Sequence, residues 1–413
     1  GGGRSSHAPH PSIPSPEGEG RLAIADLDSA DLSQFDSLVV TPGLPLNRHP
    51  IAQRAREAGL EIIGDIELFA RARPELPPHK VVGITGTNGK STTTALIHHI
   101  LKTAGVPATM GGNIGLPILA QDPLPEGGVY VLELSSYQID LTQSLDCDVA
   151  VLLNITPDHL DRYRDFQAYA ASKSRLFKMQ GPGSWSAINA EDPVADELYS
   201  RIEEEEYLGD RWQWTTFFVI EENELLLSDS ESWPSLQGPH NAQNVAAAVK
   251  CLHLLGGQHF IPVADDQIEK ALQSYPGLPH RMERIREKDG VLFVNDSKAT
   301  NPTATAPALA AFPSIRWICG GQAKSDNLDE CAPHFGHVRS AYTIGESGEL
   351  FARLLSPHMP VIACETLENA VNRAAADSQR GDTVLLSPAC ASFDQFRDFE
   401  ARGDRFRELV GAL

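Results

Sequence analysis

The sequence of 413 residues has few cysteines and no long hydrophobic run. Its six cysteines form no C-x-x-C pair, which argues against a zinc knuckle or a disulfide framework and fits a reducing compartment. No apolar run approaches the ~18 residues of a membrane-spanning helix. The N-terminus also lacks the order of charged, apolar and small residues that marks a signal peptide. We therefore expect a cytoplasmic protein without membrane insertion.

Positive charge is also scarce. The chain has 34 Lys and Arg against 55 Asp and Glu, so its formal net charge is −21. Nucleic acids and anionic membranes attract proteins with a basic surface, and this balance excludes both as partners. The length is too great for a single core, so two or three domains are expected.

Short apolar stretches alternate with helical patterns along most of the chain. In the middle, Val81–Thr85, Val129–Leu134 and Val149–Ile155 are nearly continuous apolar runs separated by helical stretches. This alternation predicts a parallel sheet covered on both faces. A similar series begins at Val291, whereas Phe217–Leu227 is typical of an antiparallel hairpin. We predict an α/β protein with domains at residues 1–78, 79–277 and 278–413.

The stretch VVGITGTNGKST at residues 81–92 has the layout of a phosphate-binding loop. An apolar strand leads into a glycine-containing turn, and a helical pattern begins directly after Lys90 and Ser91. Backbone N–H groups and the helix dipole at such a turn bind phosphate. Lys90 would reach the terminal phosphates, and the Ser91 hydroxyl would ligate Mg²⁺. Ile84 stands where the general pattern has a glycine, so the match is to the shorter form GTNGKS.

Polar clusters follow the next two apolar strands. Glu133 ends the first strand, and beside a phosphate loop we interpret its carboxylate as a ligand of Mg²⁺. A helix cap by Ser135 or Ser136, with Glu133 merely nearby, is the alternative. The second strand is followed by NITPDHLDR, which contains His159 and Arg162. Capping of the next helix by Thr156 or Asp158 explains part of this cluster but not His159 and Arg162 together. Further on, the sequence by itself presents Lys173 as a surface lysine.

Two further clusters fit nucleotide binding. Asn241 and Asn244 fall on one face of an Ala-rich helix, where Asn241 could cap the helix and Asn244 could contact a base or ribose. Arg281 lies at the expected junction between the second and third domains. An arginine there can clamp phosphates on closure, or form an ordinary salt bridge.

Three strand ends of the third domain carry chemically useful side chains. Asp296, Lys298 and Thr300 follow the first strand, Lys324 follows the second, and Ser392 follows the last. Carboxyl ends of parallel strands meet at one edge of a sheet, which is the usual ligand-binding edge. Two lysines and two hydroxyls at this edge would suit a small dicarboxylate, whereas solvated loops are the alternative.

With these residues in hand, the chain resembles the Mur ligases of peptidoglycan synthesis. The resemblance runs from Val81 nearly to the C-terminus, and NDSKATN and SPACASFDQF are similar to the branch of the family that adds D-glutamate. The matching stretches are GITGTNGKSTTT, GGNIG, LELSSYQID, LNITPDHLDRY, GPHNAQN, GLPHRME, NDSKATN and SPACASFDQFRDFEARG.

The resemblance implies an incomplete Rossmann-like uridine-nucleotide domain, a central P-loop ATPase domain with a mostly parallel sheet, and a Rossmann-like amino-acid-binding domain. It implies a monomer that uses ATP and two Mg²⁺ ions to join D-glutamate to UDP-N-acetylmuramoyl-L-alanine through an acyl phosphate. Another Mur or folylpolyglutamate-type ligase is the alternative, as is an ATP-binding regulatory protein without full substrate binding.

The resemblance also assigns roles to individual residues. Catalytic roles fall to Lys90, His159, Lys173 and Lys298, and Lys173 would carry a carbamate. Metal positions are Ser91, Glu133, His159 and carbamylated Lys173. ATP contacts are Gly86, Thr87, Asn88, Gly89, Lys90, Ser91, Thr92, Asn241, Asn244, Arg281 and Asp296. Substrate contacts are Asn113, Ser135, His159, Lys298, Thr300, Lys324, Ser392 and Phe399.

The resemblance is weakest at the front of the chain. The family's first domain opens with a strand and a Gly-rich turn that receives the uridine diphosphate. Here the sequence begins GGGRSS, and residues 1–20 are rich in Gly, Pro and Ser. Prolines obstruct strand pairing, so we expect an incomplete first domain and weak binding of the uridine-linked substrate.

Overall fold

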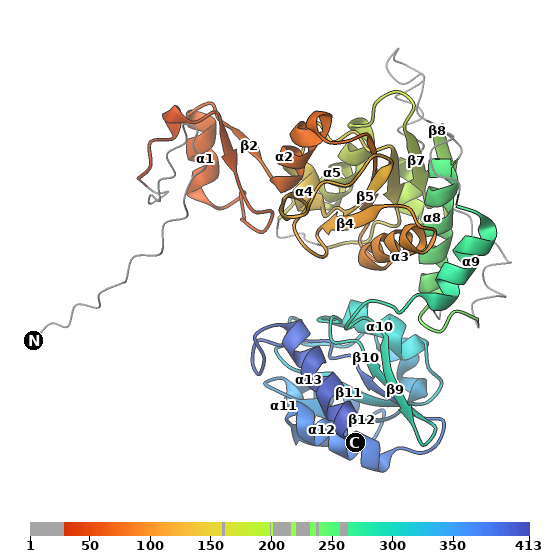
Figure 1. Ribbon diagram of the computed structural model, residues 1–413. Coiled ribbons are helices and arrows are strands. Elements are labelled where there is room, and N and C mark those ends of the chain that lie inside the picture. Colours follow the sequence, from red (N-terminus) through yellow and green to blue (C-terminus); the bar gives the residue numbers. More distant parts are fainter. Residues whose placement is uncertain are drawn as a thin grey trace, which may run out of the picture. The chain divides into compact units, whose positions relative to one another are not determined.

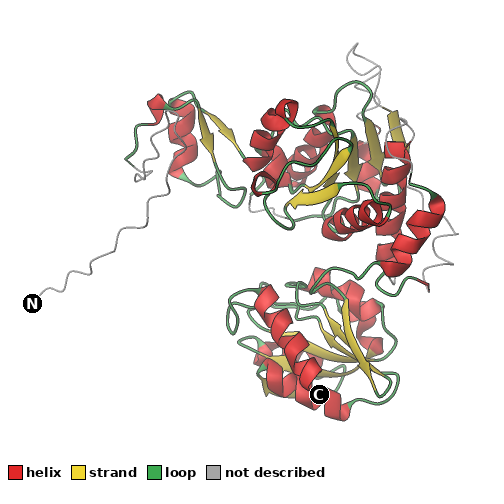
Figure 2. Cartoon of the chain, in the orientation of Figure 1, coloured by secondary structure: helices red, strands yellow, loops and turns green. Residues whose placement is uncertain are grey.

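The structure is a computed structural model that describes residues 29–158, 162–198, 200, 216–219, 232–236, 239–256 and 263–413. The chain divides into two compact units, residues 1–63 and residues 64–413. Figure 1 shows the elements coloured along the sequence, and Figure 2 shows the helices and strands. Each unit is described by itself below.

The first unit is small. Its described part has a short 3-10 helix (Leu32–Gln34), strand β1 (Ser37–Val39), helix α1 (Pro50–Glu57) and strand β2 (Glu61–Ile63). The two strands pair in parallel, as expected when a helix connects them. Ile51 and Ala55 of α1 pack with Leu32 and Leu60 in a core of its own. The sequence also predicts a short strand at Arg21–Ala25, but residues 1–28 lie outside the described residues.

The second unit begins with helix α2 (Asp65–Ala72) and contains a six-stranded parallel sheet ordered β4-β5-β3-β6-β7-β8. Strand β3 lies in the interior and carries the phosphate-loop motif at its carboxyl end. The strands are β3 (His79–Thr85), β4 (Ala108–Gly112), β5 (Gly128–Glu133), β6 (Val149–Leu152), β7 (Trp185–Ile188) and β8 (Thr216–Val219).

Helices cover both faces of this sheet. One face packs against α3 (Lys90–Thr103), α8 (Pro239–Gly256) and α9 (Asp265–Ser274). The other face packs against α2 (Asp65–Ala72), α4 (Ser136–Asp140) and α5 (Phe166–Lys178). Figure 1 shows α3, α8 and α9 together beside the sheet. Because Ile66 and Phe69 of α2 enter this core, the observed division falls at Gly64 rather than after residue 78.

A second six-stranded sheet follows in the order β13-β12-β11-β14-β10-β9. Five strands run parallel, and β9 pairs antiparallel with β10 at one edge. The strands are β9 (Glu283–Lys288), β10 (Val291–Asn295), β11 (Ile315–Gly320), β12 (Val338–Ile344), β13 (Val361–Glu365) and β14 (Thr383–Leu386). Strand β9 was not expected, because its sequence ERIREK is almost entirely charged and shows no apolar run, although one face of the strand is half-buried.

This sheet is also covered on both faces. Helices α10 (Pro302–Ala310) and α11 (Gly348–Leu355) pack on one face, and α12 (Leu367–Asp377) and α13 (Phe399–Ala412) pack on the other. The predicted fold class, α/β with parallel sheets covered by helices, is confirmed. In the sheet order, β11, β14 and β10 are neighbours, so the three polar strand ends predicted from the sequence meet at one edge.

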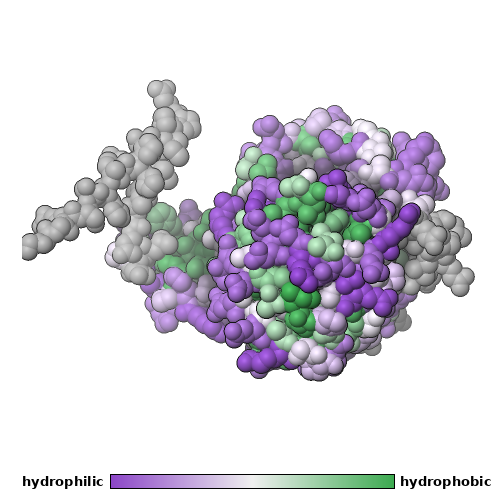
Figure 3. All heavy atoms as spheres, turned by 90° about the horizontal axis from the view of Figure 1, so that it is seen from below, coloured by the Kyte–Doolittle hydropathy of each residue, from purple (hydrophilic) through white to green (hydrophobic). Residues whose placement is uncertain are grey.

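Two local predictions concern the hairpin near residue 217 and the absence of a membrane-spanning helix. Strand β8 covers the first half of the hairpin predicted at Phe217–Leu227 and pairs in parallel with β7. The second half lies outside the described residues, so the hairpin remains a prediction. Among the described helices, none is long and apolar enough to cross a membrane. On the face drawn in Figure 3, hydrophilic residues lie interspersed with hydrophobic ones, as is ordinary for a protein surface.

Candidate active site

The phosphate-loop motif forms a tight turn between β3 and α3. Gly86 and Gly89 have φ angles of 152° and 85°, which side chains other than glycine rarely adopt. A Cβ at Gly89 would also collide with the Asn244 side chain. Gly89 therefore lets the turn lie against α8, and Gly86 lets it lie against Leu153 and Asn154. Helix α3 begins directly after this turn, so its N-terminal N–H groups are placed to bind an anion.

Asn154 and Thr156, which follow β6, hold the turn in place. The Asn154 side chain accepts from the Asn88 N–H (2.8 Å) and donates to the Asn88 carbonyl (3.1 Å). The Thr87 N–H donates to the Asn154 carbonyl (2.9 Å), and the Thr156 N–H donates to the Thr87 hydroxyl (3.0 Å). Asn154 had no predicted role. Its position at a strand end beside the loop was the available signal.

Two lysines converge on one carbonyl of the turn. Lys90 Nζ donates to the Gly86 carbonyl (2.9 Å) and the Thr87 carbonyl (2.8 Å), and Lys173 Nζ donates to the Gly86 carbonyl (2.8 Å). Burial lowers the pKa of Lys173 well below its ordinary value, and the charge of Lys90 lowers it further. Lys173 is 1% exposed, so the interpretation as a surface lysine is wrong.

Glu133 offers a carboxylate oxygen suited to a cation. Asn113 donates from Nδ2 to Glu133 Oε1 (3.0 Å), and its backbone N–H donates to the Glu133 carbonyl (2.8 Å). Glu133 Oε2 is buried and has no hydrogen-bond partner among the described residues. A buried, unpaired carboxylate oxygen is costly unless a cation meets it. Together with the Ser91 hydroxyl, it fits the Mg²⁺ role predicted for both residues.

The cluster after β6 is described only in part. His159 lies outside the described residues, so its predicted roles remain predictions. The guanidinium of Arg162 lies 4.3 Å from the centroid of the Tyr137 ring. Asp158 does not cap the next helix, because α5 begins at Phe166 and Asp165 caps it. Ser135 does cap α4, with Gln138 completing a capping box.

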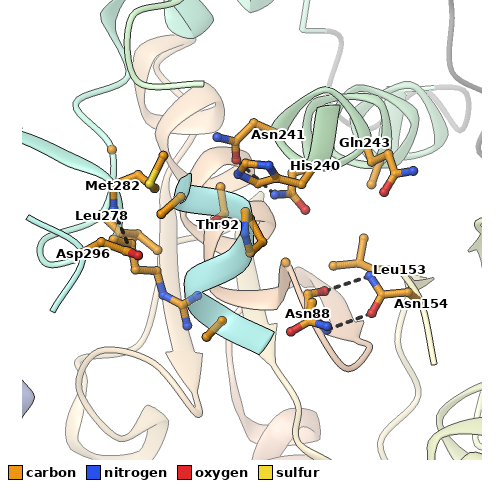
Figure 4. Close-up of a pocket in the computed structure, with 18 of the residues that line it drawn as sticks. Asn88, Thr92, Leu153, Asn154, His240, Asn241, Gln243, Leu278, Met282 and Asp296 are labelled. Atoms are coloured by element: carbon orange, nitrogen blue, oxygen red, sulfur yellow. Dashed lines mark hydrogen bonds between the residues drawn. The ribbon is translucent and has the colours of Figure 1, made fainter. Parts of the chain in front are cut away.

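A cavity of about 350 Å³ lies beside the turn and is shown in Figure 4. Asn88 and Thr92 line it from the loop and α3, His240 and Asn241 from α8, and Asp296 from the end of β10. Seven of the predicted ATP contacts line this cavity: Asn88, Gly89, Thr92, Asn241, Asn244, Arg281 and Asp296. Asn244 donates to Asn241 Oδ1 (3.2 Å) within the first turns of α8, so Asn241 lies inside the helix and is not its cap.

Two charged residues of the C-terminal segment, Arg281 and Asp296, line this cavity. Arg281 Nη2 donates to the Ser91 hydroxyl (3.0 Å), which links the junction to the phosphate loop. Asp296 accepts from the Met282 N–H (3.2 Å) and the Ser387 hydroxyl (2.7 Å). Burial raises the pKa of Asp296 to about 7, although these hydrogen bonds and Arg281 oppose the rise.

The residues predicted to bind D-glutamate do not line this cavity. Lys298 Nζ lies 5.3 Å from the centroid of the Phe399 ring, and burial lowers the pKa of Lys298 to about 8. Lys324 is exposed and Ser392 is buried. Their loops meet at a bridge between Gln322 and Ala391, two and one residues before Lys324 and Ser392. Thr300 is half-buried, just before α10.

Arg402 supports this region from α13 and had no predicted role. Its guanidinium is 1% exposed and donates to the Ser297 hydroxyl (2.9 Å) and carbonyl (2.8 Å), and to the Cys390 carbonyl (3.0 Å). It thereby ties the loop after β10 to the loop after β14. The sequence stretch containing Arg402 was noticed, but a surface arginine and a buried one look alike in sequence.

Comparisons with known proteins agree with this geometry. Residues 84–252 match the Mur ligase middle domain, and residues 280–390 match the Mur ligase glutamate ligase domain. The chain is 60% identical over 395 residues to the UDP-N-acetylmuramoylalanine–D-glutamate ligase of Novosphingobium aromaticivorans, covering 96% of this chain and 86% of that protein. The ligase of the same name from Zymomonas mobilis is 54% identical, with coverages of 96% and 87%. The chain therefore belongs to the Mur ligase family.

Solved structures show the same fold. The MurF ligase from Thermotoga maritima in complex with ADP aligns with a TM-score of 0.60 and 19% identity, covering 94% of this chain and all of that chain. At this identity the likeness concerns the fold alone.

Proposed function

We propose that this protein is an ATP-dependent ligase that joins D-glutamate to UDP-N-acetylmuramoyl-L-alanine in the synthesis of peptidoglycan precursors. The observation that carries the proposal is the cavity beside the phosphate loop, because seven residues predicted to contact ATP from separate parts of the sequence line it. The relatives at 60% and 54% identity bear the name of this activity. We place the protein in the cytoplasm and expect a monomer.

The phosphate loop would hold the triphosphate of ATP. The N–H groups at the start of α3 and the Lys90 ammonium would meet its terminal oxygens, and Arg281 would add a second cation from the junction. The substrate carboxylate then attacks the γ-phosphorus, the bond to ADP breaks, and an acyl phosphate forms. The D-glutamate amine displaces phosphate from that carbonyl carbon to form the amide.

The predicted metal positions fit two Mg²⁺ ions, which supply positive charge to the transferring phosphoryl group. Ser91 and the unpaired Oε2 of Glu133 are the oxygen donors on the described part of the chain. We propose that Lys173 carries a carbamate. Burial lowers its pKa, which favours the uncharged amine, the form that reacts with CO₂. The carbamate would give this buried position two anionic oxygens.

For D-glutamate, we propose the edge formed by the ends of β10, β11 and β14. Lys324 and Ser392 would meet the side-chain carboxylate, and Lys298, Thr300 and Phe399 would line the rest. Asn113, Ser135 and His159 would contact the uridine-linked substrate. The support is the meeting of these strand ends at one sheet edge and the bridge between the loops of Lys324 and Ser392.

Release of phosphate from ATP tests the proposal. We expect release only when D-glutamate and UDP-N-acetylmuramoyl-L-alanine are both present, with formation of the amide product. Release with a different amino acid or a folate substrate would favour another Mur or folylpolyglutamate-type ligase. Tight ATP binding with no release for any substrate pair would favour a regulatory role. Calorimetric titration of the uridine-linked substrate tests the separate expectation that it binds weakly.

A further inference from the structure

Tyr275 is a buried residue of the nucleotide cavity that the sequence did not single out. It follows α9, is 4% exposed, and lines the same cavity as Asn88, Arg281 and Asp296. Its ring packs edge-on against His99 of α3, with ring centroids 5.5 Å apart. The hydroxyl of Tyr275 has no hydrogen-bond partner among the described residues.

A second unpaired polar atom belongs to Arg281. Its Nη2 donates to Ser91, but its Nε is buried and has no partner in the described part of the chain. A buried polar group without a partner lowers stability and calls for an explanation. Here one unpaired group is an N–H donor and the other carries a phenolic oxygen that can accept. Both residues line one cavity, and the positive charge of Arg281 opposes the rise that burial causes in the pKa of Tyr275.

The backbone around Arg281 leaves its side chain as the part that can move. His280 and Met282, on either side of it, have φ angles of 62° and 47°. Such a conformation persists in residues with side chains only when the surroundings fix it. Here the Lys298 N–H donates to the His280 carbonyl (3.0 Å), and the Met282 N–H donates to Asp296 (3.2 Å), as the dashed line in Figure 4 shows.

The contact between Arg281 and Ser91 conflicts with the role proposed for Ser91. A Mg²⁺ ion at the Ser91 hydroxyl would repel the guanidinium that now donates to it at 3.0 Å. In the loaded site, the terminal nitrogens of Arg281 would turn to a phosphate, where an arginine binds most strongly. This rotation of the guanidinium would also move Nε.

We propose that Tyr275 is a positioning residue of the nucleotide site, whose hydroxyl accepts the Nε–H of Arg281 when the guanidinium turns from Ser91 to a nucleotide phosphate. The inference rests on the proposed function, since it requires ATP and Mg²⁺ at this site. It explains both unpaired atoms with one hydrogen bond. It also gives Tyr275 a role that phenylalanine cannot fill, although phenylalanine fits the same space.

The test is the Tyr275→Phe variant of the full chain, with ATP and Mg²⁺ titrated calorimetrically without the other substrates. We expect the Kd for ATP to rise about 10- to 100-fold, as loss of one hydrogen bond to a charged group does. Without nucleotide, we expect an equal or higher melting temperature, because an unpaired buried hydroxyl has been removed. A lower melting temperature together with unchanged ATP affinity would overturn the proposal.

Arg281→Lys separates the proposed partnership from a direct contact between Tyr275 and the nucleotide. Lysine keeps the charge but has no Nε, so adding Tyr275→Phe to this variant should have almost no further effect on the Kd. Independent effects of the two substitutions would overturn the pairing. Tyr342→Phe is the matched control, because the Tyr342 hydroxyl is bonded to Asp377 (3.1 Å) and Ser340 (3.0 Å). It should lower the melting temperature and leave the Kd unchanged.

Failure of this inference is distinguishable from failure of the proposed function. A wild-type chain that binds no ATP would overturn both. A wild-type chain that binds ATP, with a Tyr275→Phe variant that binds it equally well, would overturn only the role of Tyr275.

Discussion

The phosphate loop and the sheet edge proposed for D-glutamate differ in how far their side chains are already held in place. Around the loop, Ser91 and Lys173 are 1% exposed and hydrogen-bonded to groups from other segments. At the other edge Ser392 is buried, but Lys324 is exposed, and Phe393, which follows Ser392 in the sequence, is 68% exposed. Preorganised groups lose little freedom on binding, whereas exposed ones must be ordered by the ligand. Substitutions should therefore affect all ATP chemistry in the first region and mainly amino-acid recognition in the second.

The largest effect is expected for Lys90→Ala. It removes the cation that the loop directs at the transferring phosphoryl group, so phosphate release should fall by about 10³-fold or more. Circular dichroism and the melting temperature should show a folded protein. Near-normal turnover in the folded variant would show that the loop does not bind the nucleotide, and the proposed difference between the loop and the D-glutamate edge would no longer hold.

Lys173→Ala should lose activity by about 10²-fold or more, because the oxygens of the proposed carbamate disappear from the metal site. Addition of a short carboxylic acid such as acetate should restore part of the activity by supplying oxygens to the space that the lysine side chain leaves empty. Lys178→Ala, an exposed position on the same helix, is the matched control and should behave as wild type. Full activity of Lys173→Ala without additive would contradict the carbamate.

Lys324→Ala tests the second region. Loss of one charge-assisted hydrogen bond should raise the KM for D-glutamate about 10- to 100-fold and leave the KM for ATP within about twofold. Steady-state kinetics with each substrate varied in turn measure both values. Equal changes in the two KM values would mean that the regions are not separate and that the glutamate site lies elsewhere.

Asp296 gives the smallest effect, through the pH dependence of stability. An aspartate carboxyl in water has an ordinary pKa of 3.8, whereas burial raises the pKa of Asp296 in the folded state to about 7. Between these values the folded state binds more protons than the unfolded state, so the stability contributed by this group falls as pH rises from about 4 to 7. Asp296→Asn cannot titrate, so its stability relative to wild type should be greater at pH 8 than at pH 5 by about 1–3 kcal/mol.

Denaturant unfolding at the two pH values measures this difference. Thr305 supports the choice of asparagine, because its hydroxyl accepts from Ser387 (3.1 Å) and offers that residue another partner when Asp296 is replaced. An equal change in stability at pH 5 and pH 8 would show that Asp296 does not titrate between them.

Patterns within one segment predicted most of the architecture. Apolar strands alternating with helices indicated the parallel sheets, and the polar residues after β10, β11 and β14 were expected at one sheet edge because parallel strands end together. The segment GTNGKS was correctly expected between a strand and a helix, since glycine, lysine and serine at that spacing meet a local backbone requirement. The edge strand β9 and the boundary at Gly64 were not predicted, because both depend on packing against other elements.

The sequence by itself therefore determined the order of the elements, the position of the phosphate loop and the strand ends that carry polar side chains. Only the tertiary structure decided that Lys173 is buried against the Gly86 carbonyl and that Asn154 holds the loop. It also decided that Tyr275 and Arg281 line one cavity and that each has a buried atom without a partner among the described residues. The physical reason is distance along the chain. Burial and hydrogen bonding between segments far apart in sequence depend on how the helices pack on the sheets, and no local pattern records that packing.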